Sequence, residues 1–178
     1  MAAPPLTSWD VGVNPTSTIL NANIRDAINF LKNRPHAVLR RITTNQAVSN
    51  NTNTPIFWNG EDLDTDGGHS NVTNPSRYTV QTAGYYQLTP TVVWATNGSG
   101  YRQIFVAKNG DTTHRYGMAH TPVLGVSGAQ ICMNASVVLG LQAGDYVEVW
   151  GYQNSGSSLD VVVSNQDARF EIEWVSNL

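Results

Sequence analysis

The chain has 178 residues, of which 40% are hydrophobic and only 13% are charged, and its formal net charge is −3. This length suits one domain of ordinary size with a short appendage. Ten basic residues against thirteen acidic ones do not supply the basic face of a nucleic-acid-binding protein. No apolar run approaches the roughly 18 residues of a membrane span, and the first residues lack the layout of a signal peptide. We therefore expect neither nucleic acid nor a membrane as a partner.

The first 36 residues differ in pattern from the rest, and they predict an extended arm that contains Trp9, followed by a helix of roughly 16 residues. A proline in the first turn and another after the last turn mark the two ends of this helix. The apolar residues of the segment recur at steps of three and four and form one stripe: Leu20, Ile24, Ala27, Ile28 and Leu31. A helix of this length is marginal alone in water. Its stripe must therefore pack against its own domain, against sister chains or against a docking surface.

From His36 onward the hydrophobic pattern changes to a period of two, which predicts strands. The clearest strands are 84–94, 101–108, 145–152 and 169–174. In the last of them Phe170, Ile172 and Trp174 alternate with charged residues, so this apolar face must be buried. Clusters of Gly, Asn and Ser separate the strands, and Asn109-Gly110 is a strong hairpin signal. Many short strands over about 140 residues predict a mainly β protein, an antiparallel jelly-roll sandwich.

Two segments resemble the signatures of the C1q domain. The run YTVQTAGYYQL at 78–88 leads from a short strand through a glycine turn into a tyrosine-bearing strand, and LGLQAGDYV at 139–147 matches the run L-x-L-x-x-G-D-x-V. The strand at 170–174 lies where that family has its closing, aromatic-rich strand. The resemblance covers roughly residues 37–178. It implies a C1q/TNF-like jelly roll, a fold that characteristically forms trimers around a threefold axis.

Surplus aromatic residues favour self-association independently of that resemblance. Some strands carry aromatic side chains on one face and aliphatic ones on the other, and one sandwich core cannot use both faces. Either these aromatics cap the sandwich or they form the trimer interface. The candidate interface residues are Tyr85, Tyr146, Trp150 and Tyr152.

The N-terminal segment resembles the opening of small virion proteins from tailed phages that infect actinobacteria. In those proteins a tryptophan-glycine arm leads into the pattern L-N-x-x-I-R-D-x-x-x-F-L, which residues 20–31 match. A C1q-like knob often follows. The resemblance implies a docking segment at residues 1–36, with Trp9, Leu20, Ile24, Ile28 and Leu31 as anchors, and a trimerisation knob at residues 37–178. The absence of a signal peptide and of a collagen stalk argues against a complement-like or hormone-like function.

One acidic segment has half of a calcium-binding loop. Asp62, Asp64 and Asp66 followed by Gly67 match the first ligands and the glycine of an EF-hand, but Thr73 stands where a bidentate Glu is needed. Ca²⁺ is therefore a weak candidate, and we expect no other cofactor. The alternative is a solvated loop whose Asp side chains fold back on their own backbone. All these acids lie in one loop with no opposing acidic cluster, so they do not predict a catalytic pair.

The cysteine and the histidines do not predict a catalytic or metal-binding site. Cys132 is the only cysteine, and its apolar surroundings predict a buried, inert thiol. The histidines lack the spacing of a zinc site and are interpreted as loop or surface residues: His36, His69, His114 and His120. We expect no enzymatic activity.

The sequence therefore predicts a structural phage virion protein, located on the virion surface as a homotrimeric knob that decorates the capsid. Its partners would be itself and the major capsid protein or a tail protein. The alternative is a minor tail or fibre protein whose knob binds a host cell-surface glycan through loop aromatics such as Tyr101 or Tyr116.

Overall fold

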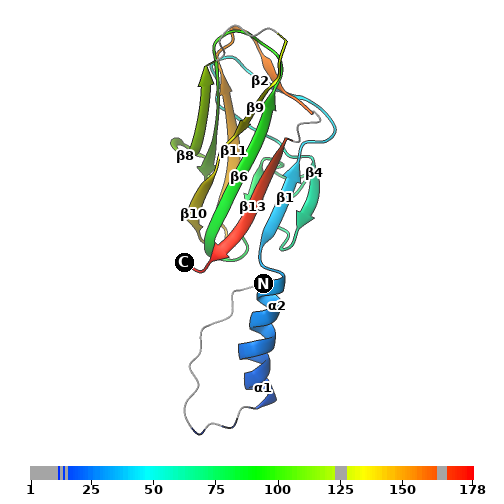
Figure 1. Ribbon diagram of the computed structural model, residues 1–178, viewed down its shortest axis with the longest axis vertical. Helices are drawn as coiled ribbons and strands as arrows, with labels where there is room; N and C mark the ends of the chain where they lie inside the picture. Colours follow the sequence, from blue (N-terminus) through cyan, green and yellow to red (C-terminus); the bar gives the residue numbers. More distant parts are fainter. Residues whose placement is uncertain (1–11, 13, 15, 123–127, 164–167) are drawn as a thin grey trace.

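Two antiparallel β-sheets pack face to face, and a helix extends from one end of this sandwich (Figure 1). The structure is a computed structural model, and it describes residues 12, 14, 16–122, 128–163 and 168–178. Trp9, predicted as a docking anchor, lies outside the described residues. The antiparallel jelly-roll sandwich that the strand pattern predicted is confirmed.

The N-terminal helix comprises three consecutive segments: α1 (Ser17–Leu20), η1 (Asn21–Arg25) with π-helical hydrogen bonding, and α2 (Asp26–Lys32). The predicted length of 16 residues is confirmed, but the helix begins two residues later than expected. Thr16 is the N-cap, because its side-chain oxygen accepts a hydrogen bond from the Ile19 backbone N–H at 3.3 Å. In Figure 1 the helix lies along the long axis of the molecule, beyond the end of the sandwich.

The first sheet has the order β2-β12-β6-β13-β1-β4, and both β9 and β10 also pair with β6. Its strands are β1 (His36–Arg40), β2 (Gln46–Val48), β4 (Gly60–Asp64), β6 (Gly84–Trp94), β9 (Ile131–Asn134), β10 (Val137–Leu141), β12 (Leu159–Val161) and β13 (Arg169–Ser176). The second sheet has the order β3-β11-β7-β8, and β5 also pairs with β11. Its strands are β3 (Thr54–Pro55), β5 (Arg77–Thr79), β7 (Tyr101–Lys108), β8 (Asp111–Pro122) and β11 (Tyr146–Gln153).

Strand β13 lies between β6 and β1 in the first sheet and directs its apolar face into the core. Phe170 and Ile172 are fully buried and Trp174 nearly so, which confirms the predicted inward face. Aromatic and aliphatic side chains of both sheets fill the space between them. Because consecutive side chains of a strand point to opposite faces, the charged neighbours on β13 necessarily face outward.

The helix is attached to the sandwich through Phe30 and Trp174. Phe30 is 3% exposed and meets the Trp174 ring edge to face, with ring centroids 4.9 Å apart. The indole Nε1 of Trp174 donates to the Ala83 carbonyl at 3.2 Å, and its backbone N–H donates to the Pro35 carbonyl at 2.9 Å. A Cβ on Gly84 would collide with the Trp174 indole, so the close approach of these strands requires glycine there.

Asp145 ties the β7–β8 hairpin to the turn before β11. Asn109 and Gly110 both have positive φ, which confirms the predicted hairpin turn. The Asp145 carboxylate forms an ion pair with Lys108 at 2.7 Å and accepts hydrogen bonds from Asn109 Nδ2 and Gln142 N, each at 2.8 Å. Burial raises the pKa of Asp145, but these contacts outweigh burial and lower the pKa to about 2.

This lowered pKa predicts acid sensitivity that Asp145→Asn removes. An unfolded Asp has a pKa of about 3.9. The stabilisation is therefore complete above that value and is lost as the pH falls through the folded pKa of about 2. In urea titrations over this range, we expect the free energy of unfolding to fall less steeply for Asp145→Asn than for the wild type. Equal slopes for the two proteins would contradict the assignment.

Candidate interaction surfaces

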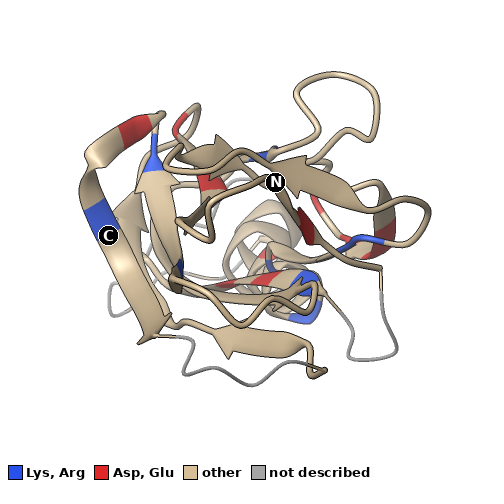
Figure 2. Cartoon of the chain, turned by 90° about the horizontal axis from the view of Figure 1, so that it is seen from above, with Lys and Arg blue, Asp and Glu red and all other residues tan. Residues whose placement is uncertain are grey.

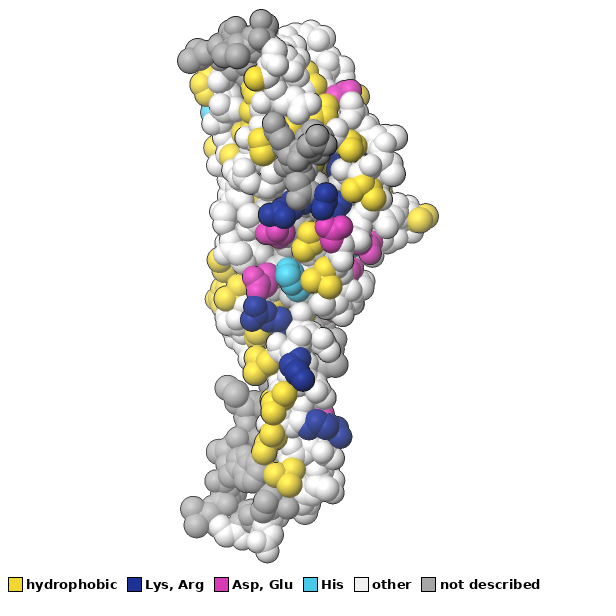
Figure 3. Space-filling model, turned by 45° about the vertical axis from the view of Figure 1, so that its right-hand side comes forward, with side chains coloured by type: hydrophobic (Ala, Val, Ile, Leu, Met, Phe, Trp, Pro, Cys, Tyr) yellow, Lys and Arg dark blue, Asp and Glu magenta, His cyan; other side chains and the backbone are white. Residues whose placement is uncertain are grey.

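The apolar stripe of the helix is exposed. Phe30 points to the sandwich, whereas the predicted anchors face away from it, with exposed fractions of 39% for Leu20, 46% for Ile24, 50% for Ile28 and 64% for Leu31. Figure 3 shows hydrophobic side chains following one another along the helix below the sandwich. Packing of the stripe on the chain's own sandwich, one of the three possibilities that the sequence left open, is therefore not what the structure shows.

A second apolar patch lies on the outer face of the first sheet, at the end nearest the helix. Tyr85 on β6 is 43% exposed, and Gly140 on β10 is its partner across the two strands. A Cβ on Gly140 would touch Leu178 and Tyr85, so both side chains stand over this glycine. Val138, two residues along β10, is also exposed. We call Tyr85, Val138 and Leu178 the Tyr85 patch.

Sequence analysis found Tyr85 but missed the other two members of this patch. A signal for Val138 existed, because its neighbours Val137 and Leu139 pack against the core and alternation sends Val138 outward. No signal existed for Leu178, which reaches the patch only through the pairing of β6 with β10 and β13.

The other three interface candidates lie on the opposite sheet. Tyr146, Trp150 and Tyr152 alternate along β11 with core residues, so they occupy the outer face of the second sheet and are half-buried. The structure therefore does not bring them together with Tyr85. The four candidates belong to two surfaces on opposite sides of the sandwich (Figure 1).

Neighbours from the same chain partly cover these β11 aromatics. The Arg77 guanidinium lies 4.0 Å from the centre of the Tyr146 ring. Tyr101 stacks on Tyr152 with ring centroids 5.5 Å apart, and His120 meets Tyr101 edge to face at 4.6 Å. Side chains of the same chain thus cover much of the aromatic surface on the outer face of the second sheet, whereas the helix stripe stays exposed.

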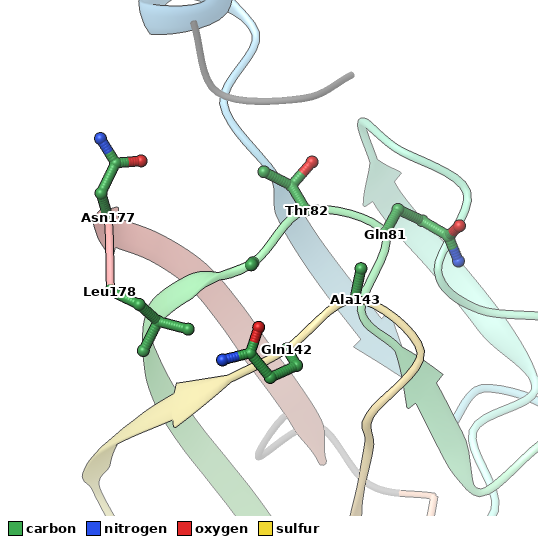
Figure 4. A pocket seen from close by; sticks show the side chains of 7 residues that line it. Gln81, Thr82, Gln142, Ala143, Asn177 and Leu178 are labelled. Carbon is green, nitrogen blue, oxygen red and sulfur yellow. The ribbon is translucent and has the colours of Figure 1, made fainter. Parts of the chain in front are cut away.

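A shallow hollow of about 470 Å³ opens beside the Tyr85 patch (Figure 4). Its lining comes from the turn before β6, the turn after β10 and the C-terminal residues: Gln81, Thr82, Ala83, Gln142, Ala143, Asn177 and Leu178. These side chains are uncharged, and three of them are amides that both donate and accept hydrogen bonds. The hollow adds uncharged hydrogen-bonding groups beside the Tyr85 patch.

Each of the three carboxylates of the acidic segment contacts other groups of the protein. Asp62 forms an ion pair with Arg40 at 2.7 Å, and Asp66 accepts a hydrogen bond from the Tyr78 hydroxyl at 2.7 Å. The Asp64 carboxylate accepts from three backbone N–H groups of its own loop, at residues 67, 68 and 69, over 2.9–3.2 Å. Among the described residues, no group of three or more His, Cys, Asp or Glu side chains could hold a metal ion. The structure thus does not form the candidate calcium site, and Asp64 folds back on its own backbone.

The surroundings of Asp66 raise its pKa. Burial is the largest cause, and the nearby Asp64 carboxylate adds to it, whereas the hydrogen bond from Tyr78 acts in the opposite direction. Burial and the Asp66 carboxylate likewise raise the pKa of Tyr78. This pair joins the loop to the core below it, which is a structural role.

The prediction of a buried thiol at Cys132 is wrong, and His69 differs in burial from the other histidines. Cys132 is exposed rather than buried, because alternation along β9 directs its neighbour Met133 into the core. His69 lies in the loop between β4 and β5, as one of the two predicted placements has it, but its side chain is fully buried and its Nδ1 lies 2.8 Å from the Arg77 carbonyl. Nδ1 must carry the proton in this contact, because a carbonyl can only accept.

Charged residues do not gather by sign. In the end-on view of Figure 2, basic and acidic positions lie interspersed over the described chain. Several of them form ion pairs on the outer face of the first sheet, such as Arg34 with Glu173 and Arg169 with Glu171. No helix in the described residues is long and apolar enough to cross a bilayer.

No family model and no curated protein matches this sequence. Solved structures do resemble the fold. Eiger TNF from S. frugiperda has a TM-score of 0.60 at 13% identity, over 82% of this chain and 96% of that one. The globular domain of zebrafish complement 1qA gives 0.59 at 13% identity, over 81% and 98%. Murine APRIL gives 0.56 at 16% identity, over 79% and 99%. The chain therefore has a C1q/TNF-like jelly-roll fold, as its motifs implied.

The role of Asp64 predicts a stability effect that is independent of calcium. Asp64→Ala leaves three backbone donors without their acceptor, so we expect the free energy of unfolding to fall by about 1–3 kcal/mol. The control Asp62→Ala removes only a surface ion pair and should cost less than about 1 kcal/mol. Adding Ca²⁺ should leave the urea midpoint of the wild type unchanged. A rise with Ca²⁺ that Asp64→Ala abolishes would contradict this assignment.

Proposed function

We propose that the chain is a structural virion protein, a homotrimeric surface knob that decorates the capsid of a tailed phage. Residues 1–36 attach the knob to the particle, and the jelly roll from residue 37 onward forms the exposed, self-associating part. The protein has no enzymatic activity in this proposal, and its partners are further copies of itself and the major capsid protein.

The observation that carries this proposal is the uneven distribution of exposed apolar side chains. Of the fourteen large hydrophobic residues exposed in the described chain, eight lie on the helix or at the sandwich end next to it. They are Leu20, Ile24, Ile28, Leu31, Tyr85, Val138, Val175 and Leu178. Exposed hydrophobic residues scattered singly are ordinary, whereas their concentration at one end of a molecule usually marks a protein–protein contact. One end of the molecule is thus suited to association and the rest to solvent.

Two further features support attachment to a particle rather than a role in free solution. The segment 20–31 resembles the opening of small virion proteins of actinobacterial phages, and in this chain it forms a helix that extends from the knob. With only 13% charged residues, the surface relies on Asn, Thr and Gly for solubility. Such a surface suits a component packed at high density beside identical copies, because like charges between neighbours are few.

A second candidate function is a minor tail or fibre protein whose knob binds a host-surface glycan. The cluster of Tyr101, Tyr152 and His120 favours this function. Tyr101 is the first residue of β7, which begins at the end of the sandwich away from the helix, and this end would point away from the particle. Aromatic rings with nearby polar groups are suited to stacking on sugar rings. The rings of this cluster are partly covered by each other, so we place this function second.

Immunogold electron microscopy tests the proposal directly. Antibodies raised against the purified full chain should label particles released from cells that carry its gene, with gold over the head. Antibodies absorbed beforehand with the purified chain provide the control and should label nothing. Gold confined to the tail would favour the second function, and particles without specific label would contradict both.

A further inference from the structure

We propose that the exposed stripe of the helix packs against the same stripe of sister chains, forming a parallel helical stem below the knobs. This inference rests on the proposed trimer and specifies what covers Leu20, Ile24, Ile28 and Leu31. The stem as a unit would then join the knob to the particle, so these four residues would contact sister helices rather than the particle.

The helix needs a partner in order to be stable. Its sequence contains Ser, Thr and three Asn, which are weaker helix formers than Ala or Leu. An isolated helix of about this length is marginal even when its residues favour helix. Its own knob covers only Phe30 fully, near the C-terminal end of the helix. The N-terminal three turns thus require burial of the stripe against another surface.

The spacing of the stripe suits parallel association. Its members follow at steps of four, four and three residues, from Leu20 to Leu31. These steps span eleven residues in three turns, a spacing that keeps an apolar seam on one side of a helix with only slight right-handed coiling. The π-helical segment at Asn21–Arg25 widens the turn between Leu20 and Ile24, which brings these two side chains closer to one line. Four large aliphatic side chains therefore form one narrow seam.

The orientation of the helix allows identical copies to meet. It lies along the long axis of the molecule (Figure 1), and the Phe30–Trp174 contact holds it to the knob. Copies related by a symmetry axis parallel to this long axis would place their helices side by side, parallel and in register. A parallel bundle with matched residues at each level requires this arrangement.

The residues beside the seam are compatible with identical neighbours. Around a symmetry axis each side chain approaches its own copies, so a charge close to the axis would repel itself. The positions next to the seam include Asn21, Asn23 and Ala27, which are uncharged, and the exposed Lys32 at the last helical residue, beside the knob. Arg25 lies 2.9 Å from Asp26 on the same helix, so these two charges compensate each other.

Disulfide trapping in the full chain tests the stem. Cys132 is the only native cysteine, so Cys132→Ser gives a background in which Ile24→Cys probes the seam. The control Ala22→Cys lies on the opposite side of the helix and is exposed. A disulfide forms only where Cα atoms come within about 7 Å. We expect Ile24→Cys to cross-link at least tenfold faster than Ala22→Cys. With three chains sharing one seam, about two thirds would run as linked pairs on a denaturing gel.

A charge variant provides a second readout that does not depend on cysteine chemistry. Ile28→Lys would bring like charges together at the seam, and we expect it to raise the concentration at which the oligomer dissociates at least tenfold. Asn29→Lys, away from the seam, should have no effect. Light scattering of the full-length variants measures both.

Each remaining outcome overturns a defined part of the account. Equal cross-linking of both cysteines, with an unchanged trimer mass, would overturn the stem while the trimeric knob stands. In that case the stripe would contact the phage particle instead of sister helices. A monomer mass with no cross-linking would overturn the stem together with the proposed trimer, which is the result expected if the chain's own first residues cover the stripe.

Discussion

The contact between Phe30 and Trp174 attaches the helix to the β-sandwich, and the position of the exposed apolar stripe depends on it. It fixes a helix of weak intrinsic stability to the end of a β-sandwich, with its remaining apolar side chains directed away from the core. Trp174 can serve this purpose because Gly84 leaves room for its indole and Ala83 accepts the indole hydrogen. The same strand, β13, pairs with β6 on one side and β1 on the other, and alternation directs its apolar face into the core. Trp174 thus contributes both to the core of the sandwich and to the placement of the helix stripe.

The sequence was most informative where the hydrophobic pattern is local and periodic. The bounds of β6 and β7, the length of the helix and the inward face of β13 follow from hydrophobic spacing, and the structure confirms them. The Asn109-Gly110 turn follows from backbone chemistry in the same way. Orientation within a short strand was harder to predict. Cys132 lies in an apolar run but faces solvent, because its neighbour Met133 takes the inward position.

What could not be read from the sequence depends on pairing between distant segments. Tyr85 and Leu178 meet over Gly140 only because β6 pairs with both β10 and β13. The other interface candidates, including Trp150, resemble Tyr85 in spacing but belong to the opposite sheet. The acidic loop has the residue types of a calcium site, yet Asp64 binds its own backbone instead. In each case a contact between segments or with the backbone, which residue types alone do not predict, determines what the side chain does.

In our proposal, identical chains cover the apolar surface that is exposed at one end of the molecule. Multi-angle light scattering of the purified full chain across a range of concentrations measures whether they do. We expect a species of three times the 19.4 kDa chain mass. A single-chain mass at every concentration would contradict it, because the stripe and the Tyr85 patch would then remain in water without a partner.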